Sequence, residues 1–281
     1  MNTFASLTFR PYSWLILLVF ALPLLAYASL PESTNVPGGV ALVPLASTAS
    51  STRKPQAWLG DQPVLVTSAH EQWVAVVGLS LDTKPGAHEL RVNIAGASQV
   101  QQFNVNTKSY PEQRLTLKDK SKVELSAADL ARAEREIAVI KGMKKHWRDA
   151  QDTDLDLIMP VAGQLASRFG LRRFFNGEPR APHAGLDVAV ARGTPIKASA
   201  PGVVLAVDDY FFNGMTVFVD HGNGLITMYC HLDHFDVQAG QAVSKGQRLG
   251  RSGQTGRATG PHLHWSVILN GAMVDPELFI Q

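Results

Sequence analysis

Residues 262–271, with the sequence HLHWSVILNG, have the pattern of a strand that ends in an Asn-Gly turn. In an extended segment residues i and i+2 lie on the same face, so His262 and His264 are expected to point together into one cavity. Asn270-Gly271 is typical of a tight hairpin turn, after which the chain folds back. This stretch predicts an antiparallel sheet that carries two imidazoles on one face.

Further strand candidates surround this stretch in the second half of the chain, residues 155–281. Short apolar runs alternate there with Gly, Asn and Pro turn residues, and long amphipathic helical patterns are absent from the sequence. We therefore expect one compact antiparallel β domain whose strands include residues 196–198, 202–207, 215–220, 225–232, 249–250 and 262–269.

A second motif, His183-Ala184-Gly185-Leu186-Asp187, supplies another imidazole and a carboxylate. With His262 or His264 it makes a set of two nitrogens and one oxygen, which leaves a coordination position open, as in a catalytic zinc site. A lone histidine is usually an ordinary core or surface residue. The clustering of six of the nine histidines between residues 183 and 264 favours a metal site.

The first half of the chain has a different organisation. Residues 58–122 contain short alternating apolar runs with a turn at 82–86, which predicts a small Ig-like antiparallel β domain. Residues 29–57 are rich in Pro, Ser and Thr, and are expected to form an extended arm or linker with one strand near its apolar patch at 40–45.

Residues 123–150 are expected to form a helix that connects the two domains. Ser126 precedes Asp129 by three residues, as in a capping box at a helix start. Apolar side chains then recur at helical spacing and predict the buried face of the helix, namely Leu130, Ala133, Ile137, Ile140 and Trp147.

Residues 1–28 have the pattern of a secretory signal peptide. The apolar run 14–28 contains Pro23, follows a segment without acidic residues and ends in Ala26-Tyr27-Ala28, a small-x-small cleavage signature. The run is shorter than the ~20 residues that span a bilayer, so a membrane anchor is expected only if the leader stays uncleaved. The protein is therefore expected to be exported to the periplasm or cell envelope.

Composition limits the function classes. A length of 281 residues allows two domains, and 45% apolar with 18% charged residues describes a globular protein. The net charge of +2 excludes the dense basic surface of a nucleic-acid binder but is compatible with an anionic cell-wall polymer. Cys230 is the only cysteine, so no intrachain disulfide can form; strand alternation would turn it away from His231, as a buried thiol.

Taken together, these residues resemble the lysostaphin-type, LytM-like zinc metalloendopeptidases that cut peptide cross-bridges in bacterial cell walls. The region from about 36 to 150 also resembles, more loosely, the β-rich domain that precedes this peptidase in some exported proteins of Gram-negative bacteria. The peptidase resemblance runs from about residue 168 to 276 and includes His183-Ala-Gly-Leu-Asp187, Gly193-Thr-Pro, Asp220-His-Gly-Asn-Gly224, Tyr229-Cys-His231, Gly253-Gln-Thr-Gly256 and Thr259-Gly-Pro-His262-Leu-His264.

The resemblance implies roles for five residues within a zinc metallopeptidase domain at 155–281. His183, Asp187 and His264 would hold one Zn²⁺ per chain, in a groove on a β-sheet, and His231 and His262 would be the catalytic histidines. We expect His262 to be the general base and His231 to stabilise the oxyanion, although the two can exchange these roles.

The resemblance also implies a substrate, the stem peptides of peptidoglycan, with D-alanyl to diaminopimelate bonds as the expected cleavage point. The alternative is a non-catalytic LytM-like activator of a cell-wall amidase, which would use the same fold without the metal ligands. The other nearby histidines, His221 in a Gly-Asn-Gly turn and His234 at a strand end, are expected to have turn or surface roles. Asp220 and Asp233 are candidates to orient a histidine.

Overall fold

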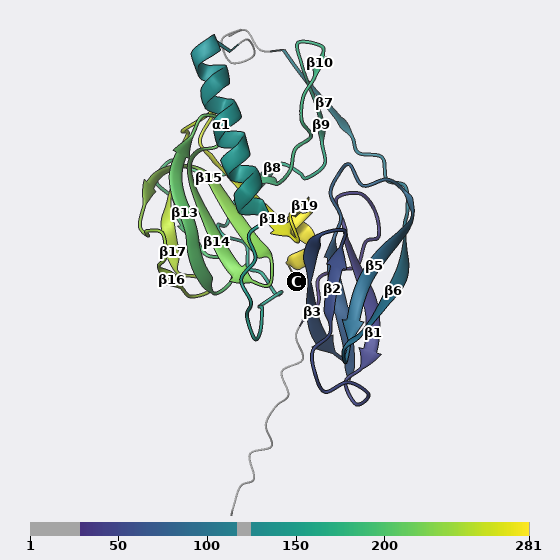
Figure 1. Cartoon of the computed structure of the whole chain (residues 1–281). Coiled ribbons are helices and arrows are strands. Elements are labelled where there is room, and N and C mark those ends of the chain that lie inside the picture. The colour runs from purple at the N-terminus through teal and green to yellow at the C-terminus, as the bar shows by residue number, and fades with distance from the viewer. Residues whose placement is uncertain (1–28, 117–124, 281) are drawn as a thin grey trace, which may run out of the picture.

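The computed structural model describes residues 29–116 and 125–280. Within them the chain is mostly antiparallel β, with an N-terminal sheet, a larger C-terminal sheet and one α-helix that comes between the two in sequence and lies against the C-terminal sheet (Figure 1). The predicted fold class is confirmed. The predicted signal peptide at 1–28 lies outside the described residues. Across residues 29–116 and 125–280, no helix combines the length and apolar content needed to cross a membrane.

The N-terminal sheet curls around its own core. Alternate residues of its strands, such as Val64 and Val66 or Ala75 and Val77, point inward and are buried together with Leu90. The strands pair in the order β1 (Val40–Ser47), β4 (Gln72–Gly78), β3 (Gln62–Ala69), β2 (Gln56–Leu59), β5 (Gly86–Ile94) and β6 (Ala97–Val105).

This sheet begins earlier than the boundary at residue 58 that we expected from the sequence. β1 is the strand that we expected near residues 40–45, but it belongs to the sheet and not to an arm: it pairs with β4 from Val40 to Ser47, and Val40, Ala41 and Val43 are buried. The pairing joins residues about 30 positions apart, so the local sequence indicated the strand and not its partner. The other predicted boundaries stay predictions.

The segment between the two large sheets contributes a strand and the helix. β7 (Glu112–Leu115) pairs in parallel with β9 (Arg172–Phe175), and β10 (Glu178–Pro179) completes a small sheet. α1 (Ala127–Lys144) begins at the predicted cap, because the Ser126 hydroxyl accepts a hydrogen bond from the Asp129 amide at 3.1 Å. The helix lies within the predicted connecting segment 123–150, of which residues 123 and 124 are outside the described residues.

The predicted apolar stripe of this helix is only partly its buried face. Ala133 is buried, whereas Leu130 and Ile137 are 48% and 53% exposed. Ile140 of the stripe and Met143 pack against buried side chains of the C-terminal sheet, and polar contacts add to this packing: Arg132 pairs with Glu136 at 2.6 Å, and Glu136 accepts the Phe211 amide at 2.5 Å. The helix therefore contacts the sheet over only part of the predicted stripe.

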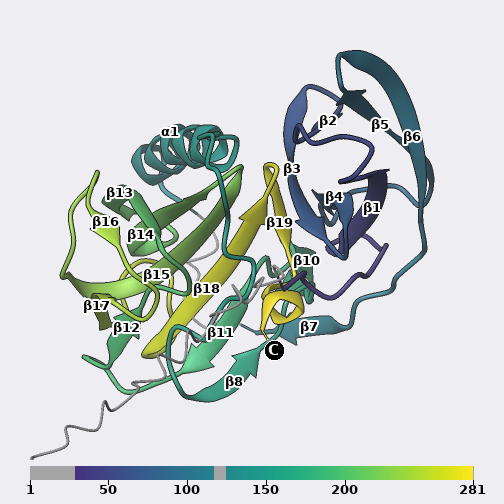
Figure 2. The ribbon, with the colours of Figure 1, turned by 90° about the horizontal axis from the view of Figure 1, so that it is seen from below.

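The C-terminal sheet has β18 (His262–Leu269) at its centre, flanked by β15 (Leu225–Phe235) and β11 (Leu186–Ala189) (Figure 2). Leu263, Trp265, Val267 and Leu269 are fully buried in the core below, so the alternate residues of β18 lie on the other face. The remaining strands are β8 (Gln164–Ser167), β12 (Pro195–Lys197), β13 (Gly202–Tyr210), β14 (Gly214–Gly222), β16 (Ala242–Val243), β17 (Arg248–Ser252) and β19 (Ala272–Val274), followed by the short helix η2 (Pro276–Phe279).

The two large sheets share one hydrophobic core. Val40, Leu65 and Val76 of the N-terminal sheet belong to the same buried cluster as Trp265 and Phe279. Strands β1, β3 and β4 are therefore buried on both faces, one against their own core and the other against the C-terminal domain. This shared core fixes the N-terminal domain beside the C-terminal sheet.

One side chain adds a specific polar link across this contact. Asn270 donates to the Gly78 carbonyl at 3.1 Å and accepts from the Gly78 amide at 2.6 Å, and both bonds are buried. Its backbone φ of 43°, with 83° at Gly271, fits the predicted Asn-Gly turn between β18 and β19. The same residue therefore closes the hairpin and joins the two domains.

We expect Asn270→Gly to destabilise the protein by about 1–3 kcal/mol, because both buried Gly78 groups lose their partner while the turn keeps a residue that tolerates positive φ. Asn270→Asp, which retains only the acceptor, should also be destabilising. Urea unfolding of residues 29–281 measures both variants. Stability equal to that of the unmodified chain in Asn270→Gly would contradict this role.

His221 is not the surface residue that we expected from its turn sequence. It is 4% exposed, and its ring nitrogens lie 2.7 Å from the Pro201 carbonyl oxygen and 2.8 Å from the Thr227 hydroxyl. Thr227 in turn contacts the Tyr229 hydroxyl at 2.9 Å. Burial lowers the pKa of His221 from 6.5 to about 4, so the folded protein holds a neutral imidazole in a core hydrogen-bond network.

This buried imidazole makes stability depend on pH. Below its ordinary pKa of 6.5 the unfolded chain takes up a proton, whereas the folded chain does so only near pH 4, so stability is fully present above 6.5 and falls as pH drops toward 4. We expect a loss of roughly 3 kcal/mol at most from this group. His221→Asn should be less stable at neutral pH but lose less on acidification. Urea midpoints across this pH range measure the difference, and parallel curves for the two proteins would refute it.

Candidate metal centre and its groove

Three donor atoms converge on the face of the C-terminal sheet that turns away from the core. His183 Nε2 lies 3.0 Å from both Asp187 Oδ1 and His264 Nδ1, and the last two atoms are 2.8 Å apart. Among the residues that the structure describes, these three are the group whose ligand atoms lie close enough together, within 4.8 Å of one another, to hold a metal ion. The structure thus brings together the three residues predicted as ligands.

Strand register and one glycine produce this convergence. Asp187 and His264 are directly opposite each other on β11 and β18, so their side chains share a face. His183 lies in the loop before β11, which passes close over β18 at Gly185. A Cβ at Gly185 would lie 2.5 Å from the Trp265 carbonyl oxygen, so the close approach requires a glycine at the centre of the motif.

The protonation pattern of the two imidazoles leaves lone pairs facing each other. His183 Nδ1 donates to the Arg168 carbonyl at 2.8 Å, so Nε2 of the neutral ring carries no proton. His264 Nε2 lies 2.9 Å from the Ser266 hydroxyl, which can accept a hydrogen bond from protonated Nε2 when Nδ1 serves as the ligand atom. Two lone pairs and a carboxylate oxygen at this spacing repel one another without a cation, and their separations approach the ~3.3 Å edge of a tetrahedral zinc site. The donor set fits a metal ion.

Arg173, which we did not identify from the sequence, orients the carboxylate ligand. Its Nη2 donates to Asp187 Oδ2 at 3.1 Å, which leaves Oδ1 for the metal side. Burial alone would raise the pKa of Asp187, but its close contacts with the His183 and His264 rings outweigh burial and hold this pKa below its usual range. Arg173 lies on β9 and belongs to neither histidine motif, so no local sequence pattern indicated its role. Ser266 could have been identified from the sequence as a partner of His264, because the two are at i and i+2 on one strand and share a face.

The two predicted catalytic histidines lie beside the cluster. The His262 Nε2 atom is 3.8 Å from Asp187 Oδ1, and the His262 ring centroid is 4.7 Å from that of His231. His262 lies outside the cluster of three, although it is on the same face as His264. The strand pattern alone could not distinguish the two, because both satisfy the i, i+2 spacing, whereas the family resemblance implied His264 as the ligand.

His231 reaches this face through an irregular backbone. Tyr229 faces the core, and strict alternation would turn His231 to the same side, away from His264. His231 instead has a φ of 62°, next to a register shift in the pairing of β14 with β15, and its ring centroid lies 6.2 Å from that of His264. Our expectation that Cys230 and His231 face opposite ways was therefore wrong, because it assumed a regular strand. Cys230 is fully buried, and burial raises the pKa of its thiol to about 12.

Both catalytic candidates carry a fixed tautomer. Nδ1 of His231 donates to the Thr255 carbonyl at 2.8 Å, and Nδ1 of His262 donates to the Gly260 carbonyl at 2.8 Å. Burial, with the nearby His264 and His262 rings, lowers the pKa of His231 to about 3. The His231 ring is therefore neutral at neutral pH, and its Nε2 has a lone pair and no proton. Nε2 can donate a hydrogen bond only after it has accepted a proton.

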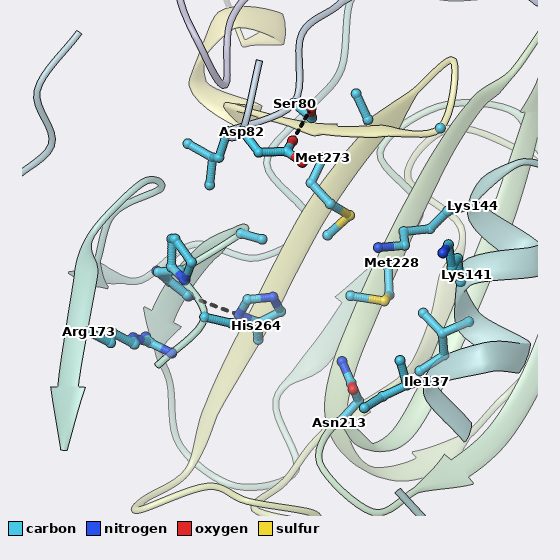
Figure 3. Close-up of a pocket in the computed structure, with 18 of the residues that line it drawn as sticks. Ser80, Asp82, Ile137, Lys141, Lys144, Arg173, Asn213, Met228, His264 and Met273 are labelled. Carbon is cyan, nitrogen blue, oxygen red and sulfur yellow. Dashed lines mark hydrogen bonds between the residues drawn. The ribbon is translucent and has the colours of Figure 1, made fainter. Parts of the chain in front are cut away.

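The cluster lies in a groove that extends to both sides. A cavity of about 700 Å³ runs from His264 toward α1 and the loop at Ser80 (Figure 3). A second cavity of about 340 Å³ is lined by the loop 257–262, Gln113 and the catalytic candidates. Arg173, Arg257 and His264 line both cavities. An extended chain could therefore cross the metal cluster with binding space on each side.

The other acidic and histidine candidates lie elsewhere. Asp220 accepts from Arg148 at 2.5 Å, and Asp233 pairs with Arg192, so neither orients a histidine of the cluster. His234 is exposed, as predicted for a surface residue.

A mainly β fold with a three-donor metal cluster, an open side and two adjacent imidazoles defines a metal-dependent hydrolase class. Residues 181–276 match the model of peptidase family M23, and residues 33–108 match that of the M23 N-terminal domain. A crystal structure of a Pseudomonas aeruginosa protein assigned to peptidase M23 is 43% identical, covers 88% of this chain and 95% of its own, and superposes with a TM-score of 0.74. The chain belongs to peptidase family M23.

Curated relatives match part of this chain. Peptidoglycan DD-endopeptidase ShyA of Vibrio cholerae is 44% identical over 113 residues, which are 40% of this chain and 26% of ShyA. DD-carboxypeptidase/endopeptidase Mpg of Neisseria meningitidis is 40% identical over 116 residues, which are 41% of this chain and 27% of Mpg. The chain thus matches about a quarter of the length of these relatives.

We expect Arg173→Gln to weaken metal binding by roughly 10- to 100-fold, because Asp187 loses the bond that orients it toward the cluster. Competition between residues 29–281 and a colorimetric chelator for Zn²⁺ measures this affinity. The neighbouring exposed Arg172 provides the matched control, and Arg172→Gln should bind as the unmodified chain does. Equal affinities for the two variants would show that Arg173 does not position the ligand.

Proposed function

We propose that this chain is an exported zinc-dependent endopeptidase that hydrolyses peptide cross-links of bacterial peptidoglycan. The observation that carries the proposal is the convergence of His183 Nε2, Asp187 Oδ1 and His264 Nδ1 within 3.0 Å of one another, beside two further imidazoles. The names of the relatives as peptidoglycan DD-endopeptidases support the substrate. This complete donor set favours a hydrolase over a non-catalytic amidase activator.

We assign the metal site to one Zn²⁺ held by His183, Asp187 and His264. A zinc ion bound there supplies Lewis acidity and lowers the pKa of a water to about 7. The protein has to hold the ligand atoms in position. Arg173 does so through its hydrogen bond to Asp187, and the Arg168 carbonyl does so by accepting a hydrogen bond from His183. Arg173 keeps the second carboxylate oxygen engaged, so one position stays free for water or substrate.

His262 and His231 are assigned to the proton transfers of the reaction. His262 is assigned as the base that takes a proton from the attacking water at Nε2, since its Nδ1 is held by the Gly260 carbonyl. The resulting imidazolium can pass that proton to the leaving amine. His231 has the same tautomer, so it can donate to the oxyanion only after it is protonated. Because both rings have the same tautomer, either can act as the base, and the two roles are exchangeable.

The bond that we propose is the D-alanyl to diaminopimelate cross-link. The β-sheet groove suits an extended peptide, and space on both sides of the metal cluster suits a cross-link, which has a peptide on each side of the cleaved bond. The periplasm is the proposed compartment, on the evidence of the apolar leader pattern at residues 1–28.

Digestion of purified diaminopimelate-containing sacculi by residues 29–281 tests the function. We expect zinc-dependent release of uncross-linked muropeptides, identified by mass spectrometry, and its loss on chelation. His262→Ala and His231→Ala should each lower the rate by roughly 10²- to 10⁴-fold while still binding one zinc ion, since neither is a ligand. His183→Ala should lose both activity and zinc. Unchanged cross-linking with a zinc-loaded protein would refute the proposal.

A further inference from the structure

α1 forms one wall of the larger cavity, and two of its lysines line that wall. Lys141 and Lys144 lie across the cavity from His264, with Met228 of β15 between them and the metal cluster (Figure 3). The helix belongs to the segment that connects the domains, so this wall lies outside the residues matched by the peptidase family model.

These two ammonium groups have no carboxylate partner among the described residues. By contrast, Arg132 and Lys245 each pair with a carboxylate at 3.3 Å or less. Asp82 is the one acidic side chain that the described residues contribute to the cavity, and its carboxylate accepts from the Ser80 hydroxyl. Burial lowers the pKa of Lys144, and the adjacent charge of Lys141 lowers it further. An anion bound between the two lysines would relieve both costs.

The surface beside the lysines is apolar. Ile140, Met228 and Met273 line the same cavity, and Met228 is 4% exposed. A ligand that fits both features has an aliphatic part that covers this surface and a carboxylate that reaches the lysines.

The lysine wall is held in place relative to the metal cluster. Arg132 of α1 donates to the Asp209 carbonyl at 3.0 Å, and Glu136 accepts the Phe211 amide. Both partners belong to the hairpin of β13 and β14, which continues through β15 to β18 and His264. A rigid connection of this kind lets a charge on the helix select where a bound peptide lies.

We propose that Lys141 and Lys144 form a subsite that binds a free carboxylate of the stem peptide. The subsite rests on the proposed function, because peptidoglycan stem peptides present carboxylates on aliphatic side chains, as diaminopimelate does. It adds a specificity determinant from the connecting helix to the peptidase groove. Through it the groove would prefer stem peptides with free carboxylates over those whose carboxyl groups are amidated.

The test compares two forms of one soluble substrate. A purified muropeptide dimer, cross-linked from D-alanine to diaminopimelate, is used as it is and after conversion of its free carboxylates to primary amides. Zinc-loaded residues 29–281 and the double variant Lys141→Gln, Lys144→Gln cleave each form, and chromatography of the products gives kcat and KM. Arg135→Gln is the matched control, since it removes one positive charge from an exposed position of the same helix that does not line the cavity.

We expect the double variant to raise KM for the carboxylate dimer about tenfold and to change kcat by no more than about twofold, because a group that binds remote carboxylate acts on affinity. With the amidated dimer the double variant and the unmodified chain should have the same KM. Arg135→Gln should resemble the unmodified chain with both substrates. An unchanged KM in the double variant, or an equal loss with both dimers, would overturn the subsite.

Binding measurements separate this proposal from the proposed function. If the zinc-loaded chain cleaves neither dimer, the endopeptidase assignment fails, and calorimetric titration with the same two dimers then decides the subsite. Tighter binding of the carboxylate form that is lost in the double variant supports the lysine subsite. Equal binding of the two forms, or no binding of either, contradicts it.

Discussion

The mutual approach of His183, Asp187 and His264 is the constraint on which the rest of the site depends. Three electron-rich atoms within 3.0 Å of one another are unfavourable unless a cation joins them, so the surrounding structure must hold them there. The cross-strand pairing of Asp187 with His264 supplies one part of this restraint. The other parts are the close approach of the chain to β18 at Gly185, the hydrogen bond from Arg173 to Asp187 and the hydrogen bond from His183 to the Arg168 carbonyl.

The parts around the cluster come from segments that are distant in sequence. β7, from the N-terminal side, pairs in parallel with β9 and so supports the strand that carries Arg173. The helix wall depends on the packing of Ile140 and Met143 against the C-terminal sheet and on polar contacts with the hairpin of β13 and β14. The N-terminal domain shares a core with the C-terminal sheet, which places its loop at Ser80 at one end of the groove. The groove is therefore a product of the whole chain, although the metal ligands belong to one domain.

Local patterns predicted much of the fold and site. Most strands of the C-terminal sheet could be located because alternation and turn residues are short-range properties, and the helix start could be located because Ser126 and Asp129 form a local cap. The apolar stripe of the helix was a poor guide to its buried face. Leu130 and Ile137 remain half-exposed, whereas Ile140 and Met143 pack on the C-terminal sheet, because contacts with residues distant in sequence decide how the helix lies. The turn sequence around His221 likewise concealed its burial beneath Thr227 and Pro201.

By itself the sequence determined the β class, the two histidines on one face of β18 and the His-x-x-x-Asp pair, because these follow from the period of a strand and from turn chemistry. Strand periodicity left open whether His262 or His264 joins the cluster; the family resemblance implied His264, and the register opposite Asp187 supplies the physical reason. Only the tertiary structure decided how His231 turns into the groove, through a positive φ that no periodicity contains. Arg173 and the lysine wall enter the site only through packing between distant segments, which sequence spacing does not encode.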